Sequence, residues 1–521
     1  MDTADHLMEI ETTLDANRSH WHQAMGILAT AMLARLVLAV CVPLFPDEAY
    51  YWEWSRQLAF GYFDHPPAIA WVIAGGTALF GDTLLGVRAP GVLLSGLGTL
   101  AIACAARRLA GDSAARFAAV IVTVMPLAAG GLVLATPDAP LFAMVAITVL
   151  ALVMAVQRGA DGDGRALALW LLAGAAIGVA MASKLTAVLV PFGVLVAVVL
   201  HPRLRAVLRT PGPWLAVALA SLVMLPVLRW NAAHDWVAFG FQLEHGFGAV
   251  SGGGVARREL ALVLTQLGLV SPILFVLFAK EIVAALRTRG EPVRYLLAAV
   301  AGSILLFFAV SALRRPVEGN WPAIAWVPAM ILLAAARRGA RTAWERRAVL
   351  LAGAISVVGL AHVVVPILPI PPRQDASIKA HGWDAVAARV DSVRASQRGR
   401  PLALAVNKYQ DAALLAFRLA DHPTVYALNI DARSNQYDLW PQFRSQAERG
   451  ASILLVLDLR EESEDPVPAP IRRLSPYFAS VERGEVVPLA RGADVVGHRR
   501  FWMLTGWSGE WPVDSVPPTP K

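Results

Sequence analysis

Long apolar runs alternate with short polar loops over the first 366 residues of the chain. Each run holds about 18–22 residues, the length that an α-helix needs to cross the hydrocarbon core of a bilayer. The pattern therefore predicts an α-helical polytopic membrane protein with about eleven spans. The predicted spans are residues 24–44, 86–106, 115–134, 138–157, 166–183, 185–200, 212–229, 260–279, 295–313, 321–336 and 347–366.

The composition agrees with a membrane protein. Of the 521 residues, 56% are hydrophobic and 16% are charged, and the mean hydropathy is +0.53. These values exclude an ordinary soluble protein of this length. The formal net charge of +7 lies mostly in short loops between the apolar runs. It therefore reports orientation in a lipid bilayer, and we expect no nucleic-acid partner.

Arginine-rich loops all fall on one side of the predicted topology, with residues 203–209, 280–294 and 337–347 among them. Because positively charged loops stay in the cytoplasm, this side is predicted to be cytoplasmic. The N-terminal tail, residues 1–23, falls on the same side. The apolar segment 68–82 is short, and counting it as a span would move the next arginine pair outside. We predict that it forms an interfacial or re-entrant helix.

The loop after the first apolar run, residues 45–67, concentrates acids, aromatic residues and one histidine. Asp47 and Glu48 follow a proline and begin a predicted short helix. Asp64 and His65 precede two further prolines, which stiffen the chain that presents them. Acids beside the end of a membrane span are costly to bury, which favours a functional site. An interfacial helix with an aromatic belt and solvated acids is the alternative.

Two more charged residues lie in loops on the same, non-cytoplasmic side. Asp138 stands between two prolines in a very short loop, either as a turn residue or as a functional carboxylate held close to the hydrocarbon. Lys184 is the only lysine before position 280 and lies between two apolar runs. Its ammonium group either extends to the interface or faces a phosphate as a point charge. We expect the phosphate contact.

Two later loops on this side are also polar. Residues 230–259 contain His234, His245 and a glycine-rich stretch, which predicts a mobile lid over the site. His234, Glu244 and His245 are candidate metal ligands, but their spacing matches no tight metal motif, and solvated or hydrogen-bonded side chains are the alternative. The next polar loop carries two arginines that oppose the orientation rule, so we expect an anionic partner there. Its candidate donor- and substrate-binding residues are Arg314, Arg315, Glu318, Asn320 and Trp321.

Residues 367–505 follow a proline-rich linker and are polar enough to fold in water, which predicts a small α/β domain on the non-cytoplasmic side. Polar segments at 407–410 and 433–438 follow two predicted strands, at the sheet edge where such domains bind ligands. Acceptor recognition and packing of a cap over the membrane domain are both open. Residues 506–521 are predicted to be a disordered tail. The predicted elements are strands 402–406, 424–428 and 452–457 and a helix at 410–420.

Four motifs, in this order and on one face, resemble the C-superfamily of membrane glycosyltransferases. They are the acid pair and the acid before Pro-Pro in the first loop, Thr-Pro-Asp at 136–138 and Ser-Lys at 183–184. The chain is most similar to the bacterial branch that includes lipid A aminoarabinose transferase and protein O-mannosyltransferases, and the likeness covers residues 24–336.

The resemblance implies an enzyme that takes a sugar from a polyprenyl-phosphate donor and transfers it to a lipid A, other lipid or glycan, or protein acceptor. Transfer would take place at the extracytoplasmic membrane face. In a bacterium this is the periplasmic side of the inner membrane, and the C-terminal domain would lie there too.

The resemblance also implies roles for individual residues. Asp47 matches the first-loop acid that acts as catalytic base, with Glu48 as its neighbour. Asp138 matches the second-loop acid near the reacting centre, and Lys184 matches a residue that contacts the donor phosphate. If the acceptor oxygen attacks the anomeric carbon directly, the configuration at that carbon inverts.

The histidine of the first loop departs from the family pattern. His65 stands where some relatives have lysine, so a phosphate contact there would depend on protonation of its ring. Asp64 matches an acid that in some relatives helps to bind a divalent metal ion together with a histidine of a later loop, here His245 or His234. No organic cofactor is implied.

A transporter or flippase of a lipid-linked anionic sugar is the main alternative, since it would account for the spans, Lys184 and the arginines. Transporter sites lie near the bilayer midplane and use broken helices or internal repeats. Here the acids gather on one face, and we find no internal repeat in the sequence. A receptor or assembly scaffold with a partner-binding outer domain is the third hypothesis.

Overall fold

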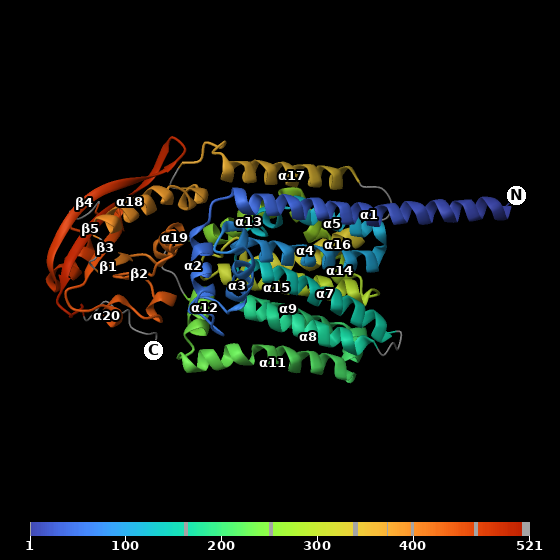
Figure 1. Cartoon of the computed structure of the whole chain (residues 1–521). Coiled ribbons are helices and arrows are strands. Elements are labelled where there is room, and N and C mark those ends of the chain that lie inside the picture. Colours follow the sequence, from blue (N-terminus) through green and yellow to red (C-terminus); the bar gives the residue numbers. More distant parts are fainter. Residues whose placement is uncertain are drawn as a thin grey trace. The chain divides into compact units, whose positions relative to one another are not determined.

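The computed structural model describes residues 2–160, 165–248, 254–336, 342–371, 374–397, 401–462 and 467–512 (Figure 1). The chain folds as two compact units. The membrane unit comprises Met1–Cys41, His65–Gly81 and Leu85–Val365, and the sheet unit comprises Val42–Asp64, Asp82–Leu84 and Pro366–Lys521.

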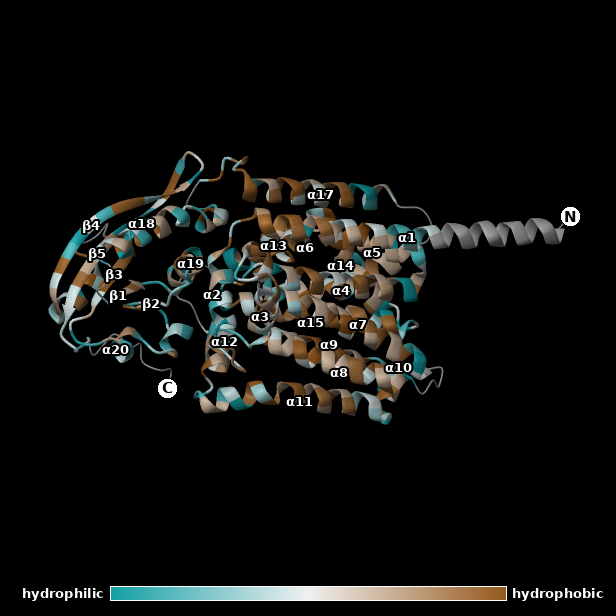
Figure 2. Cartoon of the chain, in the orientation of Figure 1, coloured by the Kyte–Doolittle hydropathy of each residue, from teal (hydrophilic) through white to brown (hydrophobic). Residues whose placement is uncertain are grey.

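Seven helices in the described residues are long and apolar enough to cross a bilayer. Their apolar stretches are brown in Figure 2. This confirms the predicted α-helical polytopic membrane fold. The seven helices are α1 (Asp2–Cys41), α4 (Leu84–Ala110), α7 (Asp138–Ala160), α8 (Ala166–Ser183), α11 (Pro211–Ala233), α15 (Pro292–Ala312) and α17 (Ala343–Val364).

Two further apolar segments are broken. Leu185–Leu200 meets Pro202–Arg209 at 109°, and α13 (Val255–Val270) meets α14 (Pro272–Arg287) at 104°. A proline begins the second helix of each pair, because the first turn of a helix does not need its missing N–H. The described spans number nine if each bent pair is one span.

The predicted count of eleven spans is therefore not confirmed, and the predicted span 260–279 runs through the break at Ser271. The predicted spans 115–134 and 321–336 consist of shorter pieces. The short helices of the membrane unit are α3 (Ala68–Phe80), α5 (Asp112–Val124), α6 (Pro126–Gly131), η1 (Leu185–Val188), α9 (Leu189–Leu200), α10 (Pro202–Arg205), η2 (Ala206–Arg209), α12 (Val237–Phe247), η3 (Trp321–Ala325) and α16 (Trp326–Ala335).

Small residues bring the membrane helices close together. A Cβ atom added at Gly193 of α9 would lie 2.6 Å from the Cα of Val300 on α15. One added at Gly178 of α8 would lie 2.8 Å from the Cβ of Val223 on α11. Close backbone approach at small residues is a packing mode that helices use in lipid. The contact at Gly178 packs the second half of α8 against α11, and Lys184 follows the last residue of α8.

The sheet unit contains a five-stranded sheet in the order β2-β1-β3-β5-β4. β1 pairs in parallel with β2 and β3, and α19 connects β1 to β2, so the predicted α/β character is confirmed. β3 pairs with β5 and β5 with β4 in antiparallel fashion. The elements are α18 (Trp383–Ser396), β1 (Leu402–Val406), α19 (Tyr409–Arg418), β2 (Val425–Ala427), α20 (Phe443–Gln446), β3 (Ser452–Asp458), α21 (Ala469–Leu474), β4 (Phe478–Arg491) and β5 (Asp494–Trp507), with η4 (Ala376–Ala380), η5 (Gln436–Asp438), η6 (Leu459–Glu462) and η7 (Ser475–Tyr477).

Two boundaries differ from those predicted. The first loop, with α2 (Pro46–Ser55), belongs to the sheet unit, whereas the sequence pattern assigned it to the membrane domain. The prediction of disorder is wrong for residues 506–512, because aromatic packing and hydrogen bonding hold them. The Trp507 indole donates to the Glu510 carbonyl at 2.6 Å, and Trp511 lies 5.5 Å from Phe443. The remaining tail, 513–521, lies outside the described residues.

Candidate active site

Three of the predicted site residues meet in the membrane unit. The Lys184 Nζ lies 2.8 Å from the Asp138 Oδ1, and the Asn320 Nδ2 donates to the Asp138 Oδ2 at 2.6 Å. Asp138 is the first residue of α7, where the positive end of the helix dipole favours a carboxylate. Lys184 is 6% exposed and lies at the junction of α8 and η1. We call Asp138, Lys184 and Asn320 the Asp138 cluster.

A cavity of about 270 Å³ adjoins the Asp138 cluster. Asp138, Asn320 and Thr136 supply polar groups to its wall, and most of the other lining residues are apolar. Apolar residues from two sides of the cavity include Leu132 and Ile324. The cavity therefore combines an apolar wall with a carboxylate that holds an ammonium group and an amide.

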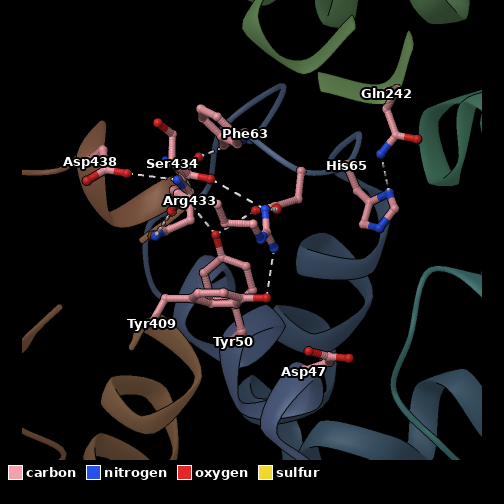
Figure 3. Close-up of polar contacts among 12 residues, drawn as sticks. Asp47, Tyr50, Phe63, His65, Gln242, Tyr409, Arg433, Ser434 and Asp438 are labelled. Carbon is pink, nitrogen blue, oxygen red and sulfur yellow. Dashed lines mark hydrogen bonds and ion pairs between the residues drawn. The ribbon is translucent and has the colours of Figure 1, made fainter. Parts of the chain in front are cut away.

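Helix α12 links several other predicted residues of the membrane unit. The ring of His245 lies 5.3 Å from that of Trp321, and the Arg315 guanidinium donates to the carbonyl of the residue before His245. The Gln242 side chain lies 3.4 Å from the Nδ1 of His65 (Figure 3). Segments of the chain that are far apart in sequence thus place a histidine, an arginine and an indole around one short helix.

The predicted lid is largely helical. Within residues 230–259, α12 and the start of α13 are described, while residues 249–253 of the glycine-rich stretch lie outside the described residues. His234 stacks on Trp230 at 4.0 Å, and its Nδ1 lies 2.8 Å from the carbonyl oxygen of the same residue. In the next loop the side chains of Arg314 and Glu318 are exposed.

The first-loop acids of the sheet unit differ in their surroundings. Asp47 is exposed at the start of α2, and its Oδ1 accepts a hydrogen bond of 2.7 Å from the side chain of Gln410. Glu48 is fully buried, and its Oε2 accepts from the backbone N–H of Phe45 at 3.0 Å. Glu48 therefore fixes the turn that leads into α2, while the carboxylate of Asp47 remains accessible to solvent.

Asp64 is held from two sides within the sheet unit. The Tyr50 hydroxyl donates to its Oδ2 at 2.6 Å, and the Arg433 guanidinium donates to its Oδ1 at 2.7 Å. Arg433 also donates to the Tyr409 hydroxyl at 2.8 Å, and the Gln436 N–H donates to the Tyr50 hydroxyl at 2.7 Å. Burial raises the pKa of Asp64, and the Arg433 charge opposes this shift. Burial also raises the pKa of Tyr409 to about 12, so its hydroxyl stays neutral. We call these five residues the Asp64 cluster.

The partners of Asp64 do not suit a metal ligand. Each carboxylate oxygen already accepts a hydrogen bond, and one of the donors is a cation. A divalent ion at Asp64 would have to displace Arg433. No group of three or more His, Cys, Asp and Glu side chains in the described ranges could hold a metal ion. The pairing of Asp64 with His245 or His234 as metal ligands stays a prediction.

The polar segments after β1 and β2 contact the first loop inside the sheet unit. Gln410 reaches Asp47, Arg433 reaches Asp64, and the Gln436 side chain accepts from the Phe63 N–H at 2.8 Å. The sequence left acceptor recognition and packing open for these segments, and the structure shows packing against the first loop. In the sequence, only the position of these segments after predicted strands indicated that they matter. The partner was not readable, because 369 residues separate Arg433 from Asp64.

Comparison with known families finds similarity to membrane glycosyltransferases. Residues 64–230 match the family model described as dolichyl-phosphate-mannose-protein mannosyltransferase. The chain is 28% identical over 383 residues to a lipid A galacturonosyltransferase, RgtD, of Rhizobium johnstonii, covering 70% of this chain and 75% of that protein. It is 30% identical over 239 residues to an undecaprenyl phosphate-alpha-4-amino-4-deoxy-L-arabinose arabinosyl transferase of Pseudomonas fluorescens, covering 41% of this chain and 42% of that one.

The fold is similar to a solved membrane protein. The apo crystal structure of ArnT from Cupriavidus metallidurans superposes with a TM-score of 0.59 at 20% identity, covering 92% of this chain and 97% of that chain. The structure of the same protein bound to undecaprenyl phosphate gives a TM-score of 0.58 at 18% identity. At these identities the likeness establishes the shared fold.

Proposed function

We propose that this chain, a member of the C-superfamily of membrane glycosyltransferases, transfers a sugar from a polyprenyl-phosphate donor to an acceptor of the bacterial cell envelope. The observation that carries the proposal is the Asp138 cluster, where a buried lysine stands beside an apolar cavity. Lipid A is the first candidate acceptor, because the relative similar over most of the chain is a lipid A galacturonosyltransferase.

The membrane-unit cavity suits both parts of such a donor. Its apolar wall matches the isoprenoid chain, whose burial is favoured by the hydrophobic effect. Lys184 offers an ammonium group to the phosphate, and Asp138 holds this group in place before the donor binds. During transfer, negative charge builds on the departing phosphate. A fixed cation at that position stabilises the transition state more than the ground state.

The reaction needs one bond to form and one to break. An acceptor hydroxyl oxygen attacks the anomeric carbon, the bond from this carbon to the phosphate oxygen breaks, and polyprenyl phosphate leaves. The hydroxyl proton passes to a carboxylate base, for which Asp47 is our candidate. Its carboxylate is solvent-exposed, so an acceptor hydroxyl can come within hydrogen-bond reach of it.

The proposed location is the bacterial inner membrane, with the site and the sheet unit on the periplasmic side. Two features support this orientation. The arginine-rich loops lie at the opposite ends of the predicted spans from Asp138 and Lys184, and such loops stay in the cytoplasm. The candidate acids also gather in loops at this side, where the resemblance to the C-superfamily implies that transfer takes place.

A transfer assay tests the proposal. Purified full-length protein is incubated with radiolabelled undecaprenyl phosphate-galacturonate or undecaprenyl phosphate-aminoarabinose and with lipid A. We expect label on lipid A, and we expect Asp47→Asn to lower the rate by about 100-fold or more, since it removes the base. Asp494→Asn, a matched change at the exposed first residue of β5, should retain the wild-type rate.

Two results would contradict the proposal. Full activity of Asp47→Asn would remove the assigned base. Movement of the labelled donor across a vesicle membrane with no transfer to lipid A, other envelope lipids or proteins would instead support the flippase hypothesis.

A further inference from the structure

The sheet unit has a second cavity, separate from the Asp64 cluster. It has a volume of about 250 Å³ and lies along β2, the edge strand of the sheet. The other walls come from residues 437–446 and from the end of α2, including Glu53. All of these elements belong to the sheet unit, and none of the residues that line the cavity has a role in the transfer reaction described above.

Aromatic rings line this cavity in two pairs. Tyr437 and Trp440 meet edge to face with centroids 5.2 Å apart, and Phe443 and Trp511 lie 5.5 Å apart. Trp440 and Trp511 are half-buried, so each keeps part of its ring surface available. Aromatic faces of this kind bind flat apolar surfaces, such as the C–H face of a sugar ring.

The polar side chains of the cavity include a hydroxyl without a partner. Tyr437 is 8% exposed, and within the described part of the chain its hydroxyl has no hydrogen-bond partner. A buried hydroxyl left in this state costs about 1–3 kcal/mol. Tyr437 lines the cavity, so a ligand there can satisfy the hydroxyl as either donor or acceptor.

A buried acid stands near this hydroxyl. Glu53 is 7% exposed, lines the same cavity and pairs with Arg56 at 2.9 Å. Burial, followed by the charge of Glu53, raises the pKa of Tyr437, and both residues line this cavity. Arg56 forms an ion pair with Glu53 in the cavity wall. The cavity therefore disfavours a free phosphate, which would lie near the Glu53 carboxyl group. A hydroxyl-rich neutral ligand would find both acceptors and donors.

We propose that this cavity binds a single pyranose ring of a glycan, with the aromatic pairs against its C–H faces and the Tyr437 hydroxyl bonded to a ring hydroxyl. The amide side chains of Gln57 and Gln442 supply further donors and acceptors. A volume of about 250 Å³ is smaller than the roughly 300–1,000 Å³ of sites for drug-sized ligands, as a one-ring ligand requires. The site does not depend on the proposed transfer reaction.

Saturation-transfer NMR and calorimetry on the full-length protein, with methyl β-D-glucopyranoside as the probe, test this site. We expect saturable binding that weakens about tenfold in Tyr437→Phe, equivalent to one lost hydrogen bond of about 1.4 kcal/mol. Tyr477→Phe, which removes a tyrosine hydroxyl outside the cavity lining, should bind like the wild type. Trp440→Ala should also weaken binding.

The choice of variants separates this site from the donor site and from a folding effect. Tyr437→Phe deletes an unsatisfied hydroxyl, so its melting temperature should equal or exceed that of the wild type. Lys184→Ala should lose transfer yet bind the glucoside normally. No saturable binding by the wild type, or equal binding by the wild type, Tyr437→Phe and Trp440→Ala, would overturn the proposal.

Discussion

Two aspartates of this chain have similar partners in different settings. In the membrane unit, Asp138 accepts from a lysine and an asparagine, and in the sheet unit Asp64 accepts from an arginine and a tyrosine. The side chain of Asp138 is 20% exposed and lines a cavity, whereas that of Asp64 is 7% exposed. Both aspartates thus lie between a cation and a neutral donor. This shared arrangement does not by itself decide whether an aspartate takes part in the reaction or stabilises the fold.

The cations account for the difference. Lysine carries a compact charge on a flexible chain, and its three donors can turn towards a new anion. Arginine presents a rigid fork, and Arg433 uses it to join Asp64 to Tyr409, so a change at one partner disturbs the others. We interpret the Asp138 cluster as a site that exchanges partners during the reaction and the Asp64 cluster as a fixed junction between the first loop and the sheet.

The largest expected effect is on catalysis. Lys184→Ala should lower the rate of sugar transfer by about 100- to 1,000-fold, because it removes the cation assigned to the departing phosphate. Lys184→Arg should retain part of the activity, and Lys280→Ala, at an exposed lysine in the middle of α14, should retain all of it. The initial rate of lipid A labelling is the measurement. A normal rate in Lys184→Ala would make Lys184 a structural residue like Arg433.

The next effect concerns a third buried acid. Burial raises the pKa of Glu53 to about 7, from 4.5. Between about pH 4.5 and 7 the Glu53 carboxyl therefore keeps its proton in the folded protein and loses it in the unfolded chain. The free energy of unfolding falls as the pH rises through this range. The difference corresponds to about 3 kcal/mol. Melting temperatures from pH 5 to 7.5 should fall less in Glu53→Gln than in the wild type. If the melting temperatures of the two proteins changed in parallel with pH, the raised pKa would not belong to Glu53.

A somewhat smaller effect is expected at the fixed junction. Arg433→Met removes the cation from a buried carboxylate, and we expect a loss of about 2 kcal/mol in unfolding free energy, a figure reduced from that of a fully buried pair because Arg433 is partly exposed. The melting temperature of the purified protein measures this loss. Arg444→Met, a matched change on the exposed surface of α20, should leave it unchanged. Wild-type stability of Arg433→Met would remove the contrast between the two clusters.

The smallest effect is expected from the amide of the Asp138 cluster. Asn320→Ala removes one hydrogen bond to Asp138 while Lys184 keeps its contact. We expect transfer to fall about fivefold to tenfold, in line with a loss of about 1 kcal/mol. Steady-state rates at saturating donor would show it. A loss as large as that of Lys184→Ala would mean that Asn320 contacts the substrate directly.

The sequence predicted the fold class and the members of the Asp138 cluster well. Span-length apolar runs need only local composition, and the rarity of lysine before position 280 singled out Lys184. The break at Ser271 was missed because hydropathy averages over a turn and ignores a missing N–H, whereas the predicted span 185–200 ends before the break at Pro202. The junction of Asp64 with Arg433 and the strands β4 and β5 were also missed. Such pairings are decided by contacts between distant segments.

Binding of the lipid phosphate to the Asp138 cluster is the central claim, and one titration tests it most directly. The affinity of undecaprenyl phosphate is measured for the wild type, Lys184→Ala and Lys280→Ala in the same detergent. We expect binding about tenfold weaker in Lys184→Ala, because one charge-assisted contact is lost, and binding by Lys280→Ala equal to that of the wild type. Equal affinities in all three proteins would contradict it.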